Sequence, residues 1–167
     1  HLWNDEVLEL FVDPDGDEEN YLEIEVNSLN AVLDLLKTSP RGNSYWDWDP
    51  EYLTAVHVEG TINDPSDEDR YWSLEMALPW SLFDVDLLDV LGDRALPPQP
   101  GDQWRFNIYR YERLRASGEE THIEYSAWSP TGEINFHRPD RFGIVAFAAG
   151  ATAVTDFTWA QVKEALR

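Results

Sequence analysis

Three segments of the chain alternate apolar and polar side chains with a period of two, and this pattern limits the fold more than any other feature. They cover residues 21–27, 71–78 and 104–111. In the first, Leu22, Ile24 and Val26 lie on one face of an extended chain, because successive side chains of a strand point to opposite faces. Such segments are typical of antiparallel strands that pack one face on a core.

Further strands are predicted at residues 6–12, 30–37, 53–59, 122–128 and 142–147. Clusters of Gly, Pro, Asn and Asp separate these runs and mark turns. Two short helices are expected, one near 79–83 and one in a C-terminal extension over 150–167. A chain of 167 residues fits one domain. We therefore predict a single all-β domain over residues 1–167, an antiparallel, jelly-roll-like β-sandwich of roughly 8–10 strands.

The charge of the chain excludes several classes of partner. It carries 33 Asp and Glu against 12 Lys and Arg, a formal net charge of -21. A field of that sign repels phosphate backbones, so we expect no nucleic-acid partner. No apolar run approaches the roughly 18 residues of a membrane helix, and no signal peptide is evident, so we expect no membrane insertion. An acidic surface of this kind is typical of a halophilic source, of cation binding or of high solubility.

The polar faces of the alternating segments are rich in aromatic, carboxylate and amide groups. If these strands share a sheet, the groups form one continuous face, whose members are Tyr21, Glu23, Glu25, Asn27, Tyr71, Glu75, Arg105, Asn107, Tyr109 and Tyr111. Aromatic rings stack on the apolar faces of sugars, and carboxylates and amides bind sugar hydroxyl groups. The pattern favours carbohydrate binding. The alternative is that this face packs under loops.

The stretch FVDPDGDEENY at residues 11–21 has two interpretations. Its alternating aspartates, Asp13, Asp15 and Asp17, suggest a calcium loop. A helix–loop–helix calcium site needs Gly at loop position six and Glu at position twelve, and here those positions hold Glu18 and Ile24. Pro and Gly between strands predict a β-turn instead. A looser calcium site with oxygen ligands from the three aspartates stays open, with calcium as a structural cofactor.

The run WNDEVLELFVD at residues 3–13 resembles a signature of family 9 carbohydrate-binding modules and their relatives. Further matching motifs follow in order over about residues 2–147, at 20–27, 55–61, 72–80, 101–107, 128–130 and 141–143. The family has a β-sandwich fold, which agrees with the strand pattern. The resemblance also implies that two or three strands precede residue 3 in a complete module.

The resemblance implies a site in which two tryptophans clamp a sugar above polar side chains. By position, Trp3 is one stacking plate, Glu9 a carboxylate that binds hydroxyls, and Asn107 a polar group. Tyr109, Trp128, Asn135 and Phe136 complete the seven candidate sugar-binding residues. The chain departs from the family at Glu25, a position on the second strand where binding modules of the family can carry an arginine. It also lacks the second tryptophan near Asn135 and Phe136, so either Phe136 or Trp128 replaces that plate.

These observations predict a non-catalytic module that binds a polysaccharide or oligosaccharide such as xylan, cellulose or their chain ends. We expect it to belong to a larger polysaccharide-degrading protein, such as a xylanase-type enzyme with other domains. Such a protein is secreted, periplasmic or displayed on the cell surface.

Two other functions stay open. Glu23 and Glu25 could form the acid pair of a glycoside hydrolase, which needs two carboxyls on the order of 5–10 Å apart. Related sandwiches bind haem through axial His or Met, and here Met76 with His122 or His137 would have to serve.

Overall fold

The computed structural model describes residues 2–64, 66–116 and 119–149. Nine strands and three short 3₁₀ helices lie within these ranges. The strands are β1 (Val7–Asp13), β2 (Tyr21–Asn27), β3 (Val32–Lys37), β4 (Ser44–Tyr45), β5 (Leu53–Glu59), β6 (Tyr71–Ala77), β7 (Gln103–Ala116), β8 (Glu119–Ala127) and β9 (Gly143–Ala146). The helices are η1 (Leu2–Asn4), η2 (Trp80–Phe83) and η3 (Pro139–Arg141).

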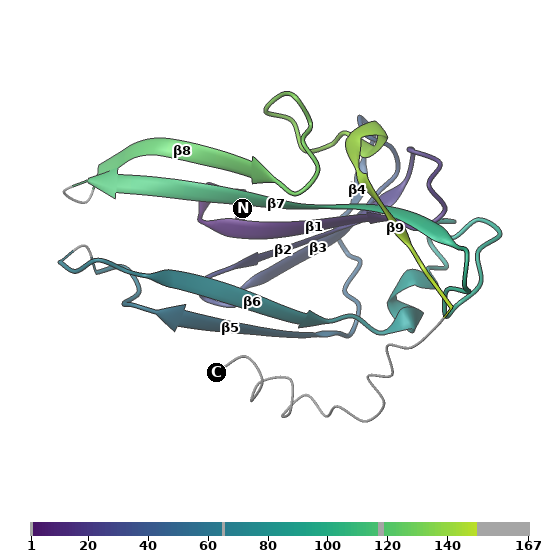
Figure 1. Ribbon diagram of the computed structural model, residues 1–167, viewed down its shortest axis with the longest axis horizontal. Coiled ribbons are helices and arrows are strands. Elements are labelled where there is room, and N and C mark those ends of the chain that lie inside the picture. The colour runs from purple at the N-terminus through teal and green to yellow at the C-terminus, as the bar shows by residue number, and fades with distance from the viewer. Residues whose placement is uncertain (1, 65, 117–118, 150–167) are drawn as a thin grey trace.

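The strands form two antiparallel layers, which Figure 1 shows one above the other. The larger sheet has the order β4-β3-β2-β1-β7-β8, and β9 also pairs with β7. The smaller sheet is the β5–β6 hairpin. The predicted all-β sandwich is therefore confirmed. No helix among the described residues is long and apolar enough to cross a membrane.

Most predicted elements lie where the alternation placed them. The helix expected near 79–83 is the single 3₁₀ turn η2. The helix expected over 150–167 lies outside the described residues. The alternation did not reveal which sheet each strand joins: Tyr71 and Glu75 lie on β6 in the smaller sheet, and so they do not share a face with Tyr21.

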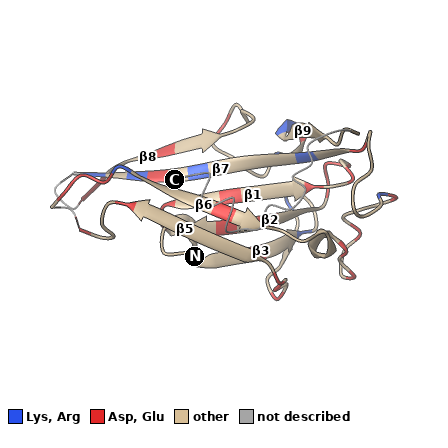
Figure 2. Ribbon diagram, turned by 60° about the horizontal axis from the view of Figure 1, so that its bottom comes forward, with Lys and Arg blue, Asp and Glu red and all other residues tan. Residues whose placement is uncertain are grey.

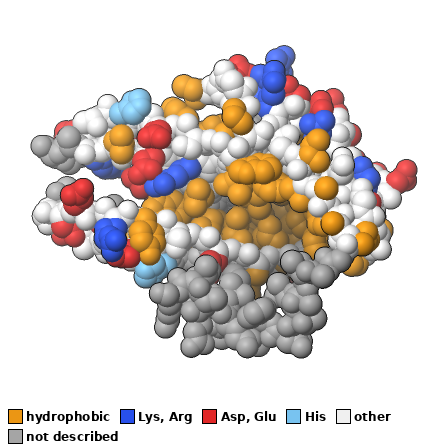
Figure 3. Space-filling view, viewed as in Figure 1, with side chains coloured by type: hydrophobic (Ala, Val, Ile, Leu, Met, Phe, Trp, Pro, Cys, Tyr) orange, Lys and Arg blue, Asp and Glu red, His pale blue; other side chains and the backbone are white. Residues whose placement is uncertain are grey.

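The main core lies between the two sheets. Leu22, Ile24 and Val26 of β2 are at most 2% exposed, and Leu74 and Met76 of β6 pack against the same cluster. Figure 3 shows hydrophobic side chains gathered between the layers. Burial of these apolar groups is the main force that holds the two sheets together.

The opposite face of the larger sheet is also largely buried. A second aromatic cluster lies there, built from Phe11, Tyr21, Tyr109, Phe136 and Phe142. Phe136 and Phe142 come from the segment between β8 and β9, which folds over this face. The interpretation that the face packs under loops is therefore right for one part of it, and what the loop leaves uncovered becomes the candidate site.

Candidate functional site

A pocket of about 340 Å³ opens on the outer face of the larger sheet. Its floor comes from β1, β2 and β3, and its walls come from η1, from the residue after β4 and from the loop at 134–137. Ten of its lining residues carry the chemistry: Trp3, Glu9, Glu23, Glu25, Lys37, Trp46, Tyr111, Asn135, Phe136 and His137.

Three carboxyl groups lie at the floor. Glu9 of β1 pairs directly with Glu25 of β2, and Glu23 lies two residues from Glu25 on the same face of β2. Their exposed fractions are 3%, 1% and 5%. Among the described residues, Oε2 of Glu23 and Oε2 of Glu25 are buried without a geometric hydrogen-bond partner. The interaction that remains for these oxygens is with each other: the Glu23 and Glu25 carboxyl groups share a hydrogen bond, which raises the pKa of Glu23 and lowers that of Glu25.

Burial raises the pKa of all three carboxyl groups. For Glu9, the pKa rises well above its ordinary value because the carboxylate is desolvated and because Glu25 and Glu23 add negative charge. Burial also raises the pKa of Glu23, and the charge of Glu25 raises it further. The pKa of Glu25 rises because of burial. A low-dielectric site disfavours the charged form, so protons are held here at a pH where an exposed glutamate is ionised.

The basic groups near the floor do little to neutralise it. Burial, together with the smaller effect of the Lys37 charge, lowers the pKa of His137 from 6.5 to about 4, so this ring is neutral at pH 7. Its Nδ1 lies 2.7 Å from the Tyr21 hydroxyl and 3.9 Å from Oε2 of Glu23. Lys37 donates to Ser44 Oγ at 2.9 Å. Lys37 is thus the one cationic side chain among the pocket's described lining residues.

Aromatic rings form the walls. The rings of Trp3 and Trp46 lie 6.3 Å apart and are tilted by 50°. Tyr111 meets Phe136 edge-on at 5.0 Å. Trp46 is 54% exposed, whereas Phe136 is 6% exposed and stacks on Tyr109 with centroids 4.1 Å apart. Trp3 and Trp46 are therefore the rings placed to cover a ligand, and Phe136 belongs to the base of the pocket.

The structure brings four of the seven predicted sugar-binding residues together. Trp3, Glu9, Asn135 and Phe136 all line the pocket. Trp128 does not: it is 55% exposed and stacks on Phe106 at 4.8 Å, and Phe106 packs toward the core between the sheets.

Asn107 and Tyr109 lie on the same sheet face but beneath the covering loop, and both are 0% exposed. The Asn107 amide donates to the Ser129 carbonyl and accepts from the Ser129 backbone N–H, each at 2.8 Å. The Tyr109 hydroxyl donates to the Phe136 carbonyl at 2.9 Å. In this structure the two side chains hold the loop over the sheet.

Sequence reasoning did not assign Trp46 or Lys37 to the site, and it placed Tyr111 only on the polar face of the sheet. Trp46 belongs to the stretch YWDWD at 45–49, which stands out because two tryptophans alternate with acidic residues. In that stretch Trp48 is buried in the core whereas Trp46 is exposed. Residues i and i+2 of an extended chain point to the same side, so the alternation did not indicate that one ring is buried and the other exposed.

The three aspartates of the β1–β2 turn also come together. Each offers one carboxylate oxygen, and these oxygens lie within 4.8 Å of one another. Asp13 is 0% exposed and accepts hydrogen bonds from the backbone N–H groups of Gly16 and Glu18 at 2.8 and 3.1 Å. Burial raises the pKa of Asp13. This donor set fits a hard cation such as calcium, and the hydrogen bonds of Asp13 fit the β-turn equally well.

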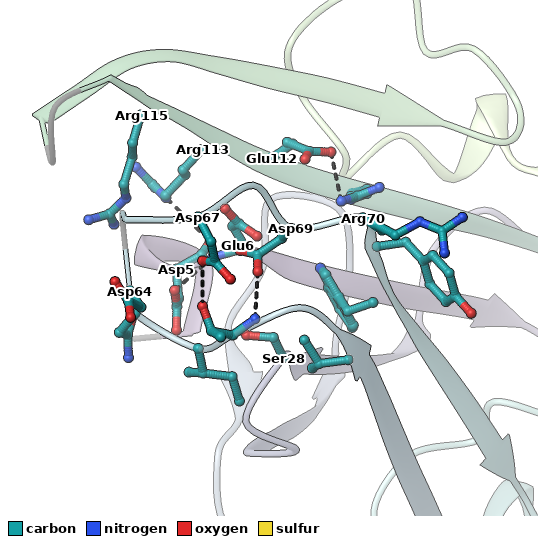
Figure 4. Close-up of a pocket in the computed structure, with 17 residues that line it drawn as sticks. Asp5, Glu6, Ser28, Asp64, Asp67, Asp69, Arg70, Glu112, Arg113 and Arg115 are labelled. Atoms are coloured by element: carbon teal, nitrogen blue, oxygen red, sulfur yellow. Dashed lines mark hydrogen bonds and ion pairs between the residues drawn. The ribbon is translucent and has the colours of Figure 1, made fainter.

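A larger cleft of about 760 Å³ lies between the end of the β5–β6 hairpin and β7. Figure 4 shows acidic and basic side chains facing each other across it. Thr61 donates to Asp67 and Asp69, and Arg113 donates to the backbone oxygens of Asp5 and Trp3. Arg110 also pairs with Glu112, whereas Arg110 Nε and the Trp72 indole N–H are buried without a hydrogen-bond partner among the described residues. The unsatisfied groups of this cleft are thus donors, whereas those of the smaller pocket are carboxyl oxygens.

The two hollows also differ in charge. Figure 2 shows acidic residues in the middle of β1, whereas basic residues gather along β7. The basic residues are Arg105, Arg110, Arg113 and Arg115. The last three line the larger cleft and none lines the smaller pocket, which therefore keeps its acidic character.

Comparison with known proteins identifies the fold. No model of a known protein family matches the chain, and no curated protein matches it. Among solved structures, it is similar to a protein from Bacteroides uniformis ATCC 8492 for which carbohydrate binding has been suggested, with a TM-score of 0.60 and 21% sequence identity. The match covers 88% of this chain and 63% of that one, so the chain spans less than two thirds of its length. At this identity the likeness shows a shared β-sandwich fold.

Proposed function

We propose that the pocket beneath Trp3 and Trp46 binds carbohydrate without cleaving it, in the manner of a family 9 carbohydrate-binding module. One observation carries the proposal: two tryptophan rings line the same pocket as buried carboxyl oxygens that have no geometric hydrogen-bond partner among the described residues. An unsatisfied buried acceptor costs on the order of 1–3 kcal/mol. A ligand with several hydroxyl groups removes that cost, and its apolar face can lie on the rings.

The neighbouring fold adds independent support. The Bacteroides protein for which carbohydrate binding has been suggested shares the β-sandwich, and the motif order of residues 2–147 resembles the family 9 group. We infer a plant-type polysaccharide such as xylan or cellulose, or its chain ends, as the target. A module of this kind works within a larger secreted or surface-attached protein that degrades polysaccharides.

The carboxyl cluster favours binding over hydrolysis. A glycosidase needs one carboxyl that is protonated and another that is ionised, so the two environments must push the pKa values apart. Here burial raises the pKa values of Glu9, Glu23 and Glu25 together, and its effect is larger than that of the Glu23–Glu25 hydrogen bond, which raises the pKa of Glu23 and lowers that of Glu25. Such a cluster supplies hydrogen bonds more readily than it divides the roles of acid and base.

The geometry does not favour the haem alternative. Met76 packs in the core between the two sheets, whereas His137 lies on the outer face of the larger sheet. His122 lies on β8 and is exposed. No pair among these residues faces a common cavity within the described chain, and two axial ligands must meet at one iron.

Isothermal titration calorimetry tests the proposal. Xylo- and cello-oligosaccharides should release or absorb heat with the wild-type protein, and Glu25→Gln should weaken their binding. Glu124→Gln removes an exposed glutamate on β8 and should leave it unchanged. No heat with any oligosaccharide, including amino sugars, would contradict the proposed function.

A further inference from the structure

We propose that the pocket prefers sugars that carry a free amino group, such as glucosamine units, over neutral or N-acetylated sugars of the same size. The inference rests on the proposed function and names the class of sugar that the site selects. Three independent features of the pocket point to a ligand with a positive charge.

The first feature is the charge of the lining. Glu9, Glu23 and Glu25 bring three carboxyl groups to the floor, and Lys37 is the one cationic group among the lining side chains described. His137 adds no charge at neutral pH, because burial lowers its pKa to about 4. With a neutral sugar, the carboxyl groups can lower this excess of negative charge only by holding protons. An ammonium group compensates it inside the pocket, where low exposure makes the attraction stronger than it would be in water.

The second feature is the type of hydrogen bond on offer. Oε2 of Glu23 and Oε2 of Glu25 are buried and have no geometric hydrogen-bond partner among the described residues. The two residues are only 5% and 1% exposed. An ammonium group has three donors and no acceptor. Once the carboxyl groups have released their protons, it can therefore satisfy these oxygens without bringing an acceptor to the floor. A hydroxyl or an acetamide group brings an acceptor with each donor.

The third feature is the walls. The rings of Trp3 and Trp46, 6.3 Å apart, stand at the mouth, and Tyr111 lines the same pocket. The faces of aromatic rings attract cations through their quadrupole, and tryptophan does so most strongly. Rings offer no ligand to a bare metal ion, which needs several oxygens around it. Aromatic walls over a carboxylate floor thus fit an organic cation better than a metal.

The test compares three monosaccharides that differ only in the group on C2 by calorimetry: the methyl glycosides of glucosamine, N-acetylglucosamine and glucose. Because the net charge of -21 attracts any cation, the titrations are run near 1 M NaCl, where the Debye length is about 3 Å. We expect the glucosamine derivative to bind at least about tenfold more tightly than the other two, since hydrogen bonds to charged groups are the stronger ones.

Variants locate the preference. Glu25→Gln should reduce the advantage of glucosamine to about twofold or less, and Glu23→Gln serves if that variant does not fold. Glu124→Gln, with the same change of charge at an exposed position of β8, should keep the full preference. An equal preference in wild type and Glu25→Gln would show attraction by the whole protein instead of by the pocket, and would overturn the inference.

A second readout counts protons. The groups that face the bound amine are Glu9 on β1, Glu23 and Glu25 on β2, Lys37 on β3, Tyr111 on β7 and His137 in the covering loop. An ammonium ion beside the carboxyl groups favours their ionised form, so binding should release protons to the buffer at pH 7. Titrations in two buffers of different ionisation enthalpy measure that release. Glucose should release none.

The outcomes separate the two proposals. If the neutral sugars bind and glucosamine binds no better, the preference is wrong and carbohydrate binding stands. If no sugar binds, carbohydrate binding itself fails. Ethanolamine, an amine without a sugar ring, is the last ligand to compare. If it binds as tightly as the glucosamine derivative, the pocket recognises the amine alone and the amino-sugar assignment is overturned.

Discussion

Glu9 on β1 stands directly opposite Glu25 on β2, and the two side chains are 3% and 1% exposed. Like charges on directly opposed residues destabilise a sheet, and burial of each carboxylate adds to the cost. The protein meets part of that cost by holding protons on the cluster, since burial raises the pKa of each acid. A site that lowers stability in this way is expected where binding requires it.

The raised pKa values predict how stability depends on pH. Between the unfolded pKa near 4.5 and the raised folded pKa, the folded state binds more protons than the unfolded one. The free energy of unfolding therefore falls as the pH rises from about 5 through neutrality. Each such group contributes at most about 1.4 kcal/mol per pH unit. Glu23→Gln should remove one contribution and flatten the curve measured by urea unfolding.

His137 changes stability in the opposite sense. Its pKa is lowered, so stability rises with pH between about 4 and 6.5. The comparison of wild type with Glu23→Gln cancels this effect, because both proteins contain His137. Glu124→Gln is the matched control and should keep the slope of the wild type. A slope that is equal in wild type and Glu23→Gln would contradict the assignment of raised pKa values to the cluster.

The next prediction separates Phe136 from Trp128, which the sequence left as alternative stacking plates. Phe136 is 6% exposed and stacks on Tyr109, so Phe136→Ala should lower the free energy of unfolding by about 3–5 kcal/mol. Trp128 is 55% exposed, so Trp128→Ala should cost only about 1 kcal/mol. Denaturant unfolding measures both. A small loss for Phe136→Ala would show that its ring is a free plate.

The sequence contained most of the fold because each strand has its own alternating pattern and each turn its own Gly or Pro. It also indicated part of the site: Trp3 and Glu9 were assigned by position in a motif, and both line the pocket. These are local signals. A residue's place in its own strand can be read without knowing what packs against it.

The rest of the site depends on contacts between distant segments. Trp46 reaches the pocket because the loop after β4 lies near η1, and no local pattern fixes that approach. Asn107 was predicted to bind sugar, yet its amide group forms two hydrogen bonds with the backbone of Ser129, 22 residues further along the chain. The burial of Glu23 and Glu25 likewise depends on their covering by distant residues of the 134–137 loop.

Calcium at the β1–β2 turn is a further prediction. If the ion binds Asp13, Asp15 and Asp17, removing it with a chelator at fixed ionic strength should lower the Tm by several degrees, on the order of a 1 kcal/mol loss. Asp15→Asn should remove that response. Asp13→Asn is less informative, because Asp13 also accepts from two backbone N–H groups and its loss lowers stability with or without calcium. An unchanged Tm would leave the aspartates as turn residues.

The sharpest prediction concerns Trp3, which should contribute more sugar affinity than any other single side chain. Its ring lies beside Trp46 in the pocket that Glu9 also lines, and its backbone is held in place, since Arg113 donates to the Trp3 carbonyl at 2.9 Å. Trp3→Ala keeps that backbone contact and removes the ring. Binding should weaken by about 1–3 kcal/mol, as expected for an aromatic residue that dominates an interface. The free energy of unfolding should change by less than about 1 kcal/mol.

Trp46→Ala and Trp128→Ala are the matched comparisons, each removing one exposed tryptophan ring. Trp46 lines the pocket, so its loss should weaken binding, although less than that of Trp3 because 54% of its surface is exposed. Trp128 lies outside the pocket, and its variant should bind sugar normally. If Trp3→Ala binds normally while Trp128→Ala does not, the sugar site lies beside Phe106 instead. A loss of about 3–5 kcal/mol in unfolding for Trp3→Ala would make its ring part of the core.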